Sequence, residues 1–522
     1  MDKLPRIRDY FAQRSVLLTG GTGFIGMGLI EGLLSASPDL QRIYVVVREK
    51  KGLAPQERLV RLLSSEIFNH HTADVKAKVV AVVGELTAEN LGLGEEILRE
   101  IRENVSVVIH NAGLIKFNRS LREAVTMNVL TTLRCIELAK SLRNLSAFIF
   151  SSTALANSNI SGRIKEEIYK TKRSPQEMIR LALETPSTID YEAEIKSILI
   201  EGHVNTYSYS KQLAENLILE EMSGLPAGIV RSALVLGFYE HQIPGWMGNS
   251  QSGQCGLVKG YVKGAVRSVL GEPNSVSFTI PCDYVVKGTL ALITSIGART
   301  THQNIPSIIH LSGTRSTNPL TIQGFTDILN EESWKNPCDS YVFLPRCKVR
   351  NGWRSDLYML LCYFIALMFY IPDYLLKLTP EWMSTTNLVL IQYKASKHFA
   401  QLPMILTDLD IKNAQNLAQR LHPDDQKKYS FDTSKINWNK LIGNCIAWLR
   451  KYYYKDSCSV TWMHRAVQIG CLFIEGAWYL WIFFTTTLAF LVAGFLLEYT
   501  MVYVLLVGLA VGLGLAGFVL WL

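Results

Sequence analysis

The sequence predicts an α/β fold with a doubly wound parallel sheet, followed by a helical C-terminal domain and C-terminal transmembrane helices. Three observations predict this arrangement. A glycine-rich turn near the N-terminus joins an apolar run to a helical pattern. Apolar runs and helical patterns then alternate, which is typical of parallel strands with crossover helices. The end of the chain holds two uncharged stretches that are long enough to cross a bilayer.

The glycine-rich turn follows the apolar run 15–18 and opens an apolar-periodic segment. Gly20 permits a sharp turn, Gly23 lets the backbone approach a pyrophosphate, and Gly26 lets the helix pack close to the strand. The helix N-terminus would then face the phosphates of a Rossmann-type dinucleotide site. The predicted cofactor-binding residues of this turn are Thr19, Gly20, Gly21, Thr22, Gly23, Phe24, Ile25 and Gly26.

The end of the second apolar run, 43–47, indicates which cofactor binds. NAD enzymes usually place an acidic residue there, whereas an arginine accommodates the extra phosphate of NADP. Arg48 occupies this position, with Lys50 and Lys51 close behind it. Glu49 competes with it, but stands one residue further on. We therefore expect Arg48 to bind the cofactor and the cofactor to be NADPH.

Three further apolar runs, 79–83, 105–109 and 148–150, complete the predicted sheet. In doubly wound sheets, the residues that carry chemistry lie at the C-terminal ends of the strands. The residues at these ends are therefore candidate site residues. Those predicted to bind the cofactor are Glu85, Leu86, Asn111 and Ala112, and those predicted to take part in catalysis are Ser152 and Thr153.

Tyr207 and Lys211 form the next candidate group. They are four residues apart in a helical pattern, so their side chains share one face of the helix. An ammonium group favours the phenolate, so we expect Lys211 to lower the pKa of Tyr207 toward neutrality and make it a usable acid or base. After a nucleotide turn and a Ser-Ser-Thr strand end, the pair indicates chemistry on a carbonyl group.

Composition excludes several classes of protein. The net charge of +8 includes no basic run interleaved with aromatic residues, so no nucleic-acid partner is predicted. The nine cysteines form no CxxC pair and HExxH is absent, so reduced thiols and no metal site are expected. The ten histidines show no clustering, and His110 and His203 are expected to be structural. The charged N-terminus does not resemble a signal peptide.

Taken together, these motifs resemble the extended short-chain dehydrogenases, and more narrowly the alcohol-forming fatty acyl-CoA reductases. The segment from Arg163 to Gly202 resembles the long charged insertion of these reductases, and 421–452 resembles their C-terminal domain. The resemblance extends from about Ile7 to Asp456. It is also carried by the short stretches 7–11, 116–118, 127–129, 205–207, 244–246 and 281–286.

The resemblance implies NADPH-dependent reduction of a long-chain fatty acyl-CoA to a primary fatty alcohol, with two hydride transfers and release of CoA. Tyr207 would donate the proton to the carbonyl oxygen, and Thr153, assisted by Ser152, would hydrogen-bond that oxygen. Lys211 would bind the nicotinamide ribose, and Asn128 would hold a water that relays protons. Two alternatives stay open: a membrane-bound sterol dehydrogenase of the same superfamily, and a catalytically silent NADPH-binding membrane scaffold.

The predicted domains are an extended Rossmann domain, 1–345, a helical C-terminal reductase domain, 346–460, and a membrane anchor, 466–522. The anchor contains the spans 477–497 and 501–522, either as a tight hairpin or as one span and an embedded segment. The uncharged stretch 357–371 is shorter and suits a core or interfacial helix. Basic residues upstream of the anchor predict a catalytic domain facing the cytosol, on the endoplasmic reticulum or a peroxisome. The oligomeric state is left open.

Overall fold

The computed structural model describes residues 3–50, 52–184, 200–249, 253–299, 304–316, 318–339, 345–350 and 408–456, with single residues elsewhere. The chain divides into two compact units. The first comprises Met1–Leu257, Asn274–Phe325 and Gln401–Trp448, and the second comprises Val258–Pro273, Thr326–Ala400 and Leu449–Leu522. The predicted domain boundaries stay a prediction, since most of 346–460 lies outside the described residues.

A seven-stranded sheet forms the centre of the first unit, in the order β11-β7-β5-β4-β1-β2-β3. All of its strand pairs are parallel. The order reverses between β1 and β4, which creates the switch point where doubly wound sheets bind ligands. The predicted doubly wound parallel sheet is confirmed. Its strands are β1 (Ser15–Thr19), β2 (Arg42–Val47), β3 (Val79–Val83), β4 (Val105–His110), β5 (Ala147–Thr153), β7 (Ala227–Ser232) and β11 (Ser307–Leu311).

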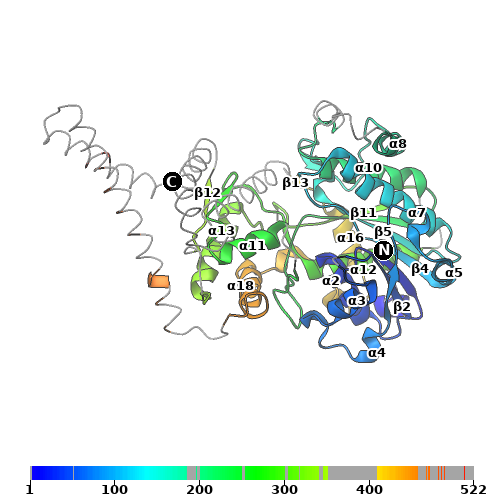
Figure 1. Cartoon of the computed structure of the whole chain (residues 1–522), viewed down its shortest axis with the longest axis horizontal. Coiled ribbons are helices and arrows are strands. Elements are labelled where there is room, and N and C mark those ends of the chain that lie inside the picture. The colour runs from blue at the N-terminus through cyan, green and yellow to red at the C-terminus, as the bar shows by residue number, and fades with distance from the viewer. Residues whose placement is uncertain are drawn as a thin grey trace. The chain divides into compact units, whose positions relative to one another are not determined.

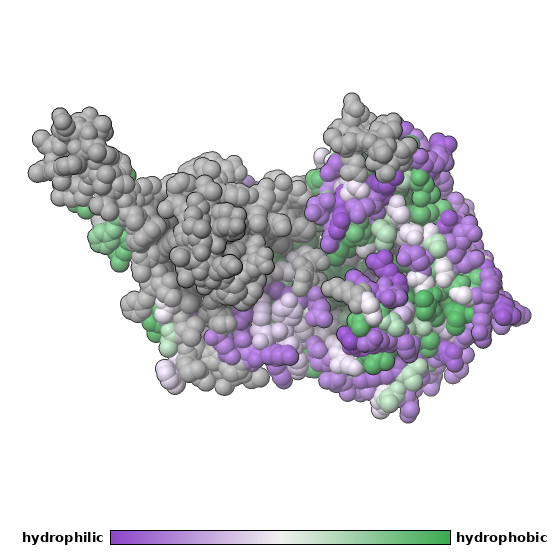
Figure 2. Space-filling model, viewed as in Figure 1, coloured by the Kyte–Doolittle hydropathy of each residue, from purple (hydrophilic) through white to green (hydrophobic). Residues whose placement is uncertain are grey.

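Helices cover both faces of this sheet (Figure 1). One face contacts α5 (Glu95–Asn104), α7 (Thr131–Lys140) and α10 (Thr206–Glu221), and the other contacts α12 (Cys282–Gly297) and α16 (Lys412–Arg420). Because both faces are covered, the central strands β1 and β4 are buried along their whole length and mostly apolar. Where the described residues are coloured in Figure 2, their surface is mostly hydrophilic, with smaller hydrophobic areas between.

Helix α2 (Phe24–Ala36) follows the glycine-rich turn and packs closely on α12. A Cβ atom added to Gly28 would lie 3.1 Å from the Phe238 ring and 3.2 Å from a methyl group of Val286. Gly32 lies against the same valine. Gly28 and Gly32, one turn apart, therefore allow α2 and α12 to approach closely. This contact fixes the position of α2, whose N-terminus faces the switch point.

The structure describes further elements outside the main sheet. Among the described residues, three two-stranded parallel pairs form: β10 with β8, β12 with β9, and β13 with β6. The strands are β6 (Arg163–Ile164), β8 (Leu234–Leu236), β9 (Ser268–Leu270), β10 (Thr279–Pro281), β12 (Lys348–Arg350) and β13 (Asp408–Leu409). The α-helices are α1 (Ile7–Phe11), α3 (Pro55–Leu63), α4 (Ala73–Lys76), α6 (Leu121–Val125), α8 (Pro175–Glu184), α11 (Gly253–Val262), α13 (Ile322–Lys335), α17 (Pro423–Lys428) and α18 (Trp438–Trp448). The 3₁₀ and π turns are η1 (Glu66–Phe68), η2 (Glu89–Gly92), η3 (Thr126–Leu130), η4 (Ala154–Asn157), η6 (Thr433–Lys435) and η7 (Leu449–Tyr453).

The helices of the described residues include none that is both long and apolar enough to cross a bilayer. The predicted spans 477–497 and 501–522 lie outside the described residues except at single positions. The stretch 357–371 lies outside them entirely.

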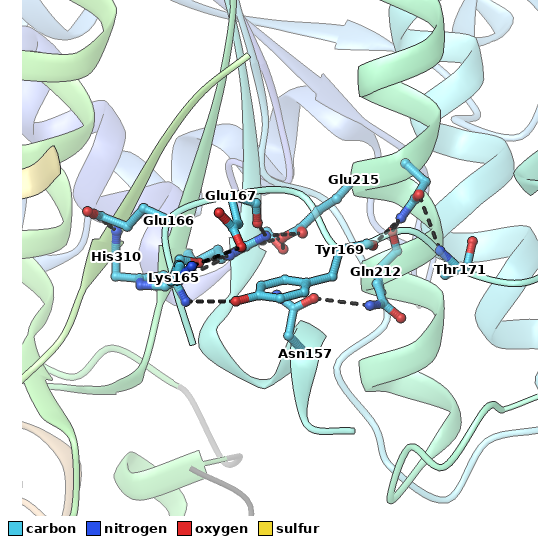
Figure 3. A network of polar contacts seen from close by, with 12 residues as sticks. Asn157, Lys165, Glu166, Glu167, Tyr169, Thr171, Gln212, Glu215 and His310 are labelled. Carbon is cyan, nitrogen blue, oxygen red and sulfur yellow. Dashed lines mark hydrogen bonds and ion pairs between the residues drawn. The ribbon is translucent and has the colours of Figure 1, made fainter. Parts of the chain in front are cut away.

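A fully buried ion pair joins α10 to the sheet. The Arg231 guanidinium donates to both carboxylate oxygens of Glu215, at 2.9 Å from Nε and 2.7 Å from Nη2, and both side chains are 0% exposed. Arg231 also donates to the carbonyl oxygens of Lys165 and Glu167. Figure 3 shows Glu215 beside the segment that carries these two residues. The pair therefore connects β7, α10 and the loop after β6.

Removing one charge of this pair should destabilise the first unit strongly. Glu215→Gln leaves a buried guanidinium without its counter-ion, which typically costs about 3–5 kcal/mol. The matched control is Glu221→Gln on the same helix, which breaks the surface pair with Lys140 (2.7 Å) and should cost less than about 1 kcal/mol. Denaturant unfolding followed by tryptophan fluorescence would measure both. Equal losses for the two variants would contradict the role given to the buried pair.

Candidate active site

The glycine-rich turn brings the end of β1 against the end of β4. Gly20 has a φ of +71°, and a Cβ atom added to it would lie 2.6 Å from the backbone nitrogen of Ala112. A Cβ atom on Gly26 would collide with the carbonyl oxygen of Gly20. Only glycine fits at these two positions, so the turn places the backbone of α2 directly over the switch point of the sheet.

Polar contacts hold this turn to the residues after β4. The Ala112 N–H donates to Thr19 Oγ1 at 3.2 Å, and Asn111 Nδ2 donates to the Gly20 carbonyl at 3.3 Å. Four predicted cofactor-binding residues, two from each strand end, therefore meet. Helix α2 begins after Gly23, and no side chain of the described residues caps it. Its first N–H groups are thus suited to an anion.

Two arginines lie at the neighbouring strand ends. Arg48 follows β2, and its Nη1 is 3.9 Å from a carboxylate oxygen of Glu85, which follows β3. Arg58 on α3 donates to the Arg48 carbonyl at 2.5 Å and to Thr22 Oγ1 at 3.5 Å. Burial and the nearby Arg48 charge lower the pKa of Arg58. Arg58 was missed in the sequence, because nothing in the spacing of α3 shows that one of its arginines returns to the glycine turn.

The reacting group forms where β5 ends and α10 begins. Tyr207 and Lys211 lie on α10 as predicted, and the Tyr207 hydroxyl lies close enough to that of Thr153 for the two to interact. The Tyr207 ring also stacks on Phe117, with the ring centroids 5.6 Å apart. The structure therefore brings together a phenol and a hydroxyl from two different elements. Tyr209, two positions later, points elsewhere and donates to Glu201 at 3.3 Å.

The predicted effect of Lys211 on Tyr207 is wrong for this structure. Burial raises the pKa of Tyr207 to about 12, and the interaction with Thr153 offsets this only in part. Burial also lowers the pKa of Lys211 to about 8, although Glu215 opposes the shift. The Lys211 ammonium donates to the Ser151 carbonyl at 2.8 Å and lies over the Phe150 ring. Its charge is therefore directed to the end of β5 and does not stabilise the phenolate.

Asn128 lies in the π turn η3, within the stretch 121–142 that the sequence predicts as helical. Its Oδ1 accepts from the Leu114 N–H at 2.7 Å, and its Nδ2 donates to the Leu114 carbonyl at 3.1 Å and to Ser210 Oγ at 2.8 Å. The amide group thus fixes the segment after β4 to α10. Both N–H groups of the amide are used, so the predicted water relay stays a prediction.

Ser152 lies next to Thr153 but faces a different partner. Its hydroxyl donates to Glu215 at 2.5 Å, so this hydrogen is committed to the buried ion pair. Its predicted help in catalysis stays a prediction. The buried His110 contacts Thr19 and Thr132, and burial lowers its pKa to about 3, in keeping with a structural role.

The other predicted cofactor-binding residues line the same edge of the sheet without forming a tight group. Leu86 packs its partly buried side chain against the hydrophobic core. The Phe24 ring lies 5.4 Å from that of Trp246. A Cβ atom added to Gly21 would lie 2.5 Å from a methyl group of Val45, so this glycine serves packing under the turn.

Comparison with known proteins agrees with this geometry. The family model described as "Male sterility protein", an NAD-binding domain, matches residues 18–289. A putative fatty acyl-CoA reductase of Drosophila melanogaster is 38% identical over 524 residues, covering 99% of this chain and 93% of the relative. Fatty acyl-CoA reductase 1 of Homo sapiens is 30% identical over 469 residues, covering 87% of each chain.

Solved structures show the same fold. The terminal R domain from the myxalamid PKS-NRPS biosynthetic pathway has a TM-score of 0.57 at 19% identity, and covers 84% of this chain and 90% of that one. The R domain of a nonribosomal peptide synthetase from Mycobacterium tuberculosis has a TM-score of 0.56 at 16% identity, covering 84% and 91%. By its sequence relatives, the matched domain and its fold, the chain belongs to the fatty acyl-CoA reductases, a family of oxidoreductases with a nicotinamide cofactor.

Proposed function

We propose that this protein reduces a long-chain fatty acyl-CoA to the primary fatty alcohol, with NADPH as the hydride donor. The observation that carries the proposal is the contact between Tyr207 and Thr153 beside Lys211, at the edge where the glycine turn lies. A phenol and a hydroxyl that converge there can hold a carbonyl oxygen. The names of the relatives support the acyl-CoA substrate.

The side chains suit a reaction that builds charge on an oxygen. The reaction would need two NADPH molecules in succession, each supplying one hydride: the first to the thioester carbon, with CoA leaving as its thiol, and the second to the resulting aldehyde. Because the pKa of Tyr207 is raised to about 12, its phenol keeps its proton at neutral pH and can donate it to the developing oxyanion. Thr153 holds the same oxygen by a hydrogen bond. Lys211, anchored on the Ser151 carbonyl, is placed to bind the nicotinamide ribose.

Tyr207→Phe keeps the ring and its stacking on Phe117 but removes the proton donor. We expect turnover with acyl-CoA to fall by roughly 10²–10⁴-fold, the usual loss for a positioned general acid. NADPH binding should change little. Supplied fatty aldehyde should be reduced equally slowly, since both hydride steps form an oxyanion at one place. Steady-state rates with the two substrates would measure this.

The control for this variant is Tyr209→Phe, which removes a phenol of the same helix that contacts Glu201. It should keep turnover near the unmodified rate. If Tyr207→Phe reduces aldehyde normally but fails with acyl-CoA, Tyr207 serves only the first step. An unchanged rate with both substrates would refute Tyr207 as the proton donor. If the unmodified chain were also inactive, a catalytically silent NADPH-binding scaffold would be favoured.

The preference for NADPH rests on Arg48 and Arg58. The Arg58 guanidinium reaches Thr22 of the turn and the Arg48 carbonyl, and the Arg48 side chain lies at the end of β2 beside Glu85. A 2′-phosphate bound at this strand end would accept charge-assisted hydrogen bonds from the two arginines. Arg48→Ala and Arg58→Ala should each raise the KM for NADPH by about tenfold or more and leave the KM for acyl-CoA nearly unchanged.

The control for these variants is Arg61→Ala, on the same α3 helix, which breaks only the surface pair with Glu57. It should leave the KM for NADPH unchanged. Initial rates at varied NADPH and NADH would measure the effect. Equal use of NADH by the unmodified protein would contradict the proposed cofactor.

We further propose that the region after residue 466 anchors the protein in the endoplasmic reticulum or peroxisomal membrane, with the reductase in the cytosol. The support is the length and apolar character of 477–497 and 501–522. A chain ending at Asp456 should leave the membrane fraction at least in part, while 357–371 can keep a weak interfacial affinity. Carbonate extraction of membranes would measure this against the full chain. Complete retention of the shortened chain would place the anchor elsewhere.

A further inference from the structure

Three histidines meet at one buried carboxylate, away from the reductase site. Glu31 lies in the middle of α2, His70 and His71 follow η1, and His241 lies in the loop after β8. The distances from Glu31 Oε1 to the histidine Nε2 atoms are 3.2 Å for His241, 3.5 Å for His70 and 3.9 Å for His71. Sequence analysis missed this group, because Glu31 and His241 are far along the chain from the adjacent pair His70 and His71.

The group is largely closed to solvent. The side-chain exposure is 8% for Glu31, 8% for His71, 10% for His241 and 22% for His70.

Two imidazole nitrogens in this group, Nε2 of His71 and Nε2 of His241, are buried without a hydrogen bond from the described residues. His71 Nε2 has none although it lies close to the carboxylate. A buried polar atom without a partner is costly, so such an atom usually marks a bound water or ion. The side chain is more than nine-tenths buried and is aimed at Glu31.

His241 has a different part in the group. Its Nδ1 accepts from the Ile243 N–H at 3.0 Å, so in the neutral ring the proton is on Nε2, facing Glu31 at 3.2 Å. A nitrogen that carries a proton cannot bind a metal ion. His241 is therefore left out of the ligand set, and its buried Nε2 makes no hydrogen bond with the described residues. Ser35 orients the carboxylate by donating to Oε1 at 2.6 Å.

The remaining three groups match a metal site in both type and spacing. The ligand atoms of Glu31, His70 and His71 all lie within 4.8 Å of one another. In a tetrahedral zinc site, bonds of ~2.0–2.2 Å place the donor atoms about 3.4 Å apart. The distances of 3.5 Å and 3.9 Å from Glu31 to the two imidazoles are close to this value. We propose that Glu31, His70 and His71 bind a Zn²⁺ ion.

The surroundings suit such an ion. A cavity of about 850 Å³, whose lining includes Glu31, His70 and His241, adjoins the group and leaves room for a water as the fourth ligand. The ion would tie α2 to the segment after α3, two parts of the first unit that the sheet does not join directly. Its role would be structural, because the group is separate from Tyr207 and Thr153.

Metal binding to the full chain in detergent tests the proposal directly. After removal of metals with a chelator, the chain should bind one Zn²⁺ with a Kd below about 1 μM, measured by competition with a chromogenic indicator. Glu31→Gln and His71→Ala should each weaken binding by more than about 100-fold, since changes to outer-shell groups alone cost ~10–100-fold. Co²⁺ in place of Zn²⁺ should give the visible absorption of a tetrahedral site.

The matched control is His422→Asn, which removes a histidine that caps α17 and keeps a capping side chain. It should bind Zn²⁺ like the unmodified chain. NADPH binding by each variant reports whether it has folded, and His70→Ala replaces any variant that has not. The proposal is overturned if the unmodified chain binds no Zn²⁺ in this range, or if the folded ligand variants bind it as well as the control does.

Discussion

The buried pair of Arg231 and Glu215 is the interaction on which the reductase unit depends most. All five N–H groups of this guanidinium are used: three donate to Glu167, Lys165 and the neutral imidazole of His310, and two donate to the carboxylate. Burial and the Arg231 charge lower the pKa of His310 to about 3, so its nitrogen can accept. Because every N–H group of this buried guanidinium has an acceptor, β7, β11 and α10 are restricted to one arrangement. A shift of α10 would remove Glu215 and leave the buried charge of Arg231 unpaired.

This constraint reaches the active site through α10. Glu215 lies one turn after Lys211, and it also accepts from Ser152 of β5, so the helix and the strand end are fixed in register. Tyr207 then meets Thr153 because the pair sets the rotation of the helix, while Tyr209 points to the opposite side. The positions of the reacting groups therefore follow from a network one turn further along the helix.

Much of this arrangement could be predicted from local patterns. The apolar runs predicted as strands β1 to β5 all lie in the sheet, because strands buried on both faces must be apolar throughout. The strand β7 was not predicted, since Arg231 interrupts its apolar pattern. The spacing of Tyr207 and Lys211 correctly predicts that both side chains lie on one helix. It could not give the direction of the Tyr207 pKa shift, which depends on burial by residues that are distant in the sequence.

Other polar contacts could not be predicted from the sequence either, because they join segments that are distant along the chain. Arg58 reaches Thr22 only because α3 folds back over the end of β2, and the histidines 70 and 71 meet Glu31 only because α2 is fixed by its glycine packing on α12. In both cases a helix near the glycine turn gains a polar partner that no spacing rule gives. The turn and α2 are therefore the part of the chain where local sequence predicts the backbone well. The charged groups gathered around that backbone are decided by tertiary packing.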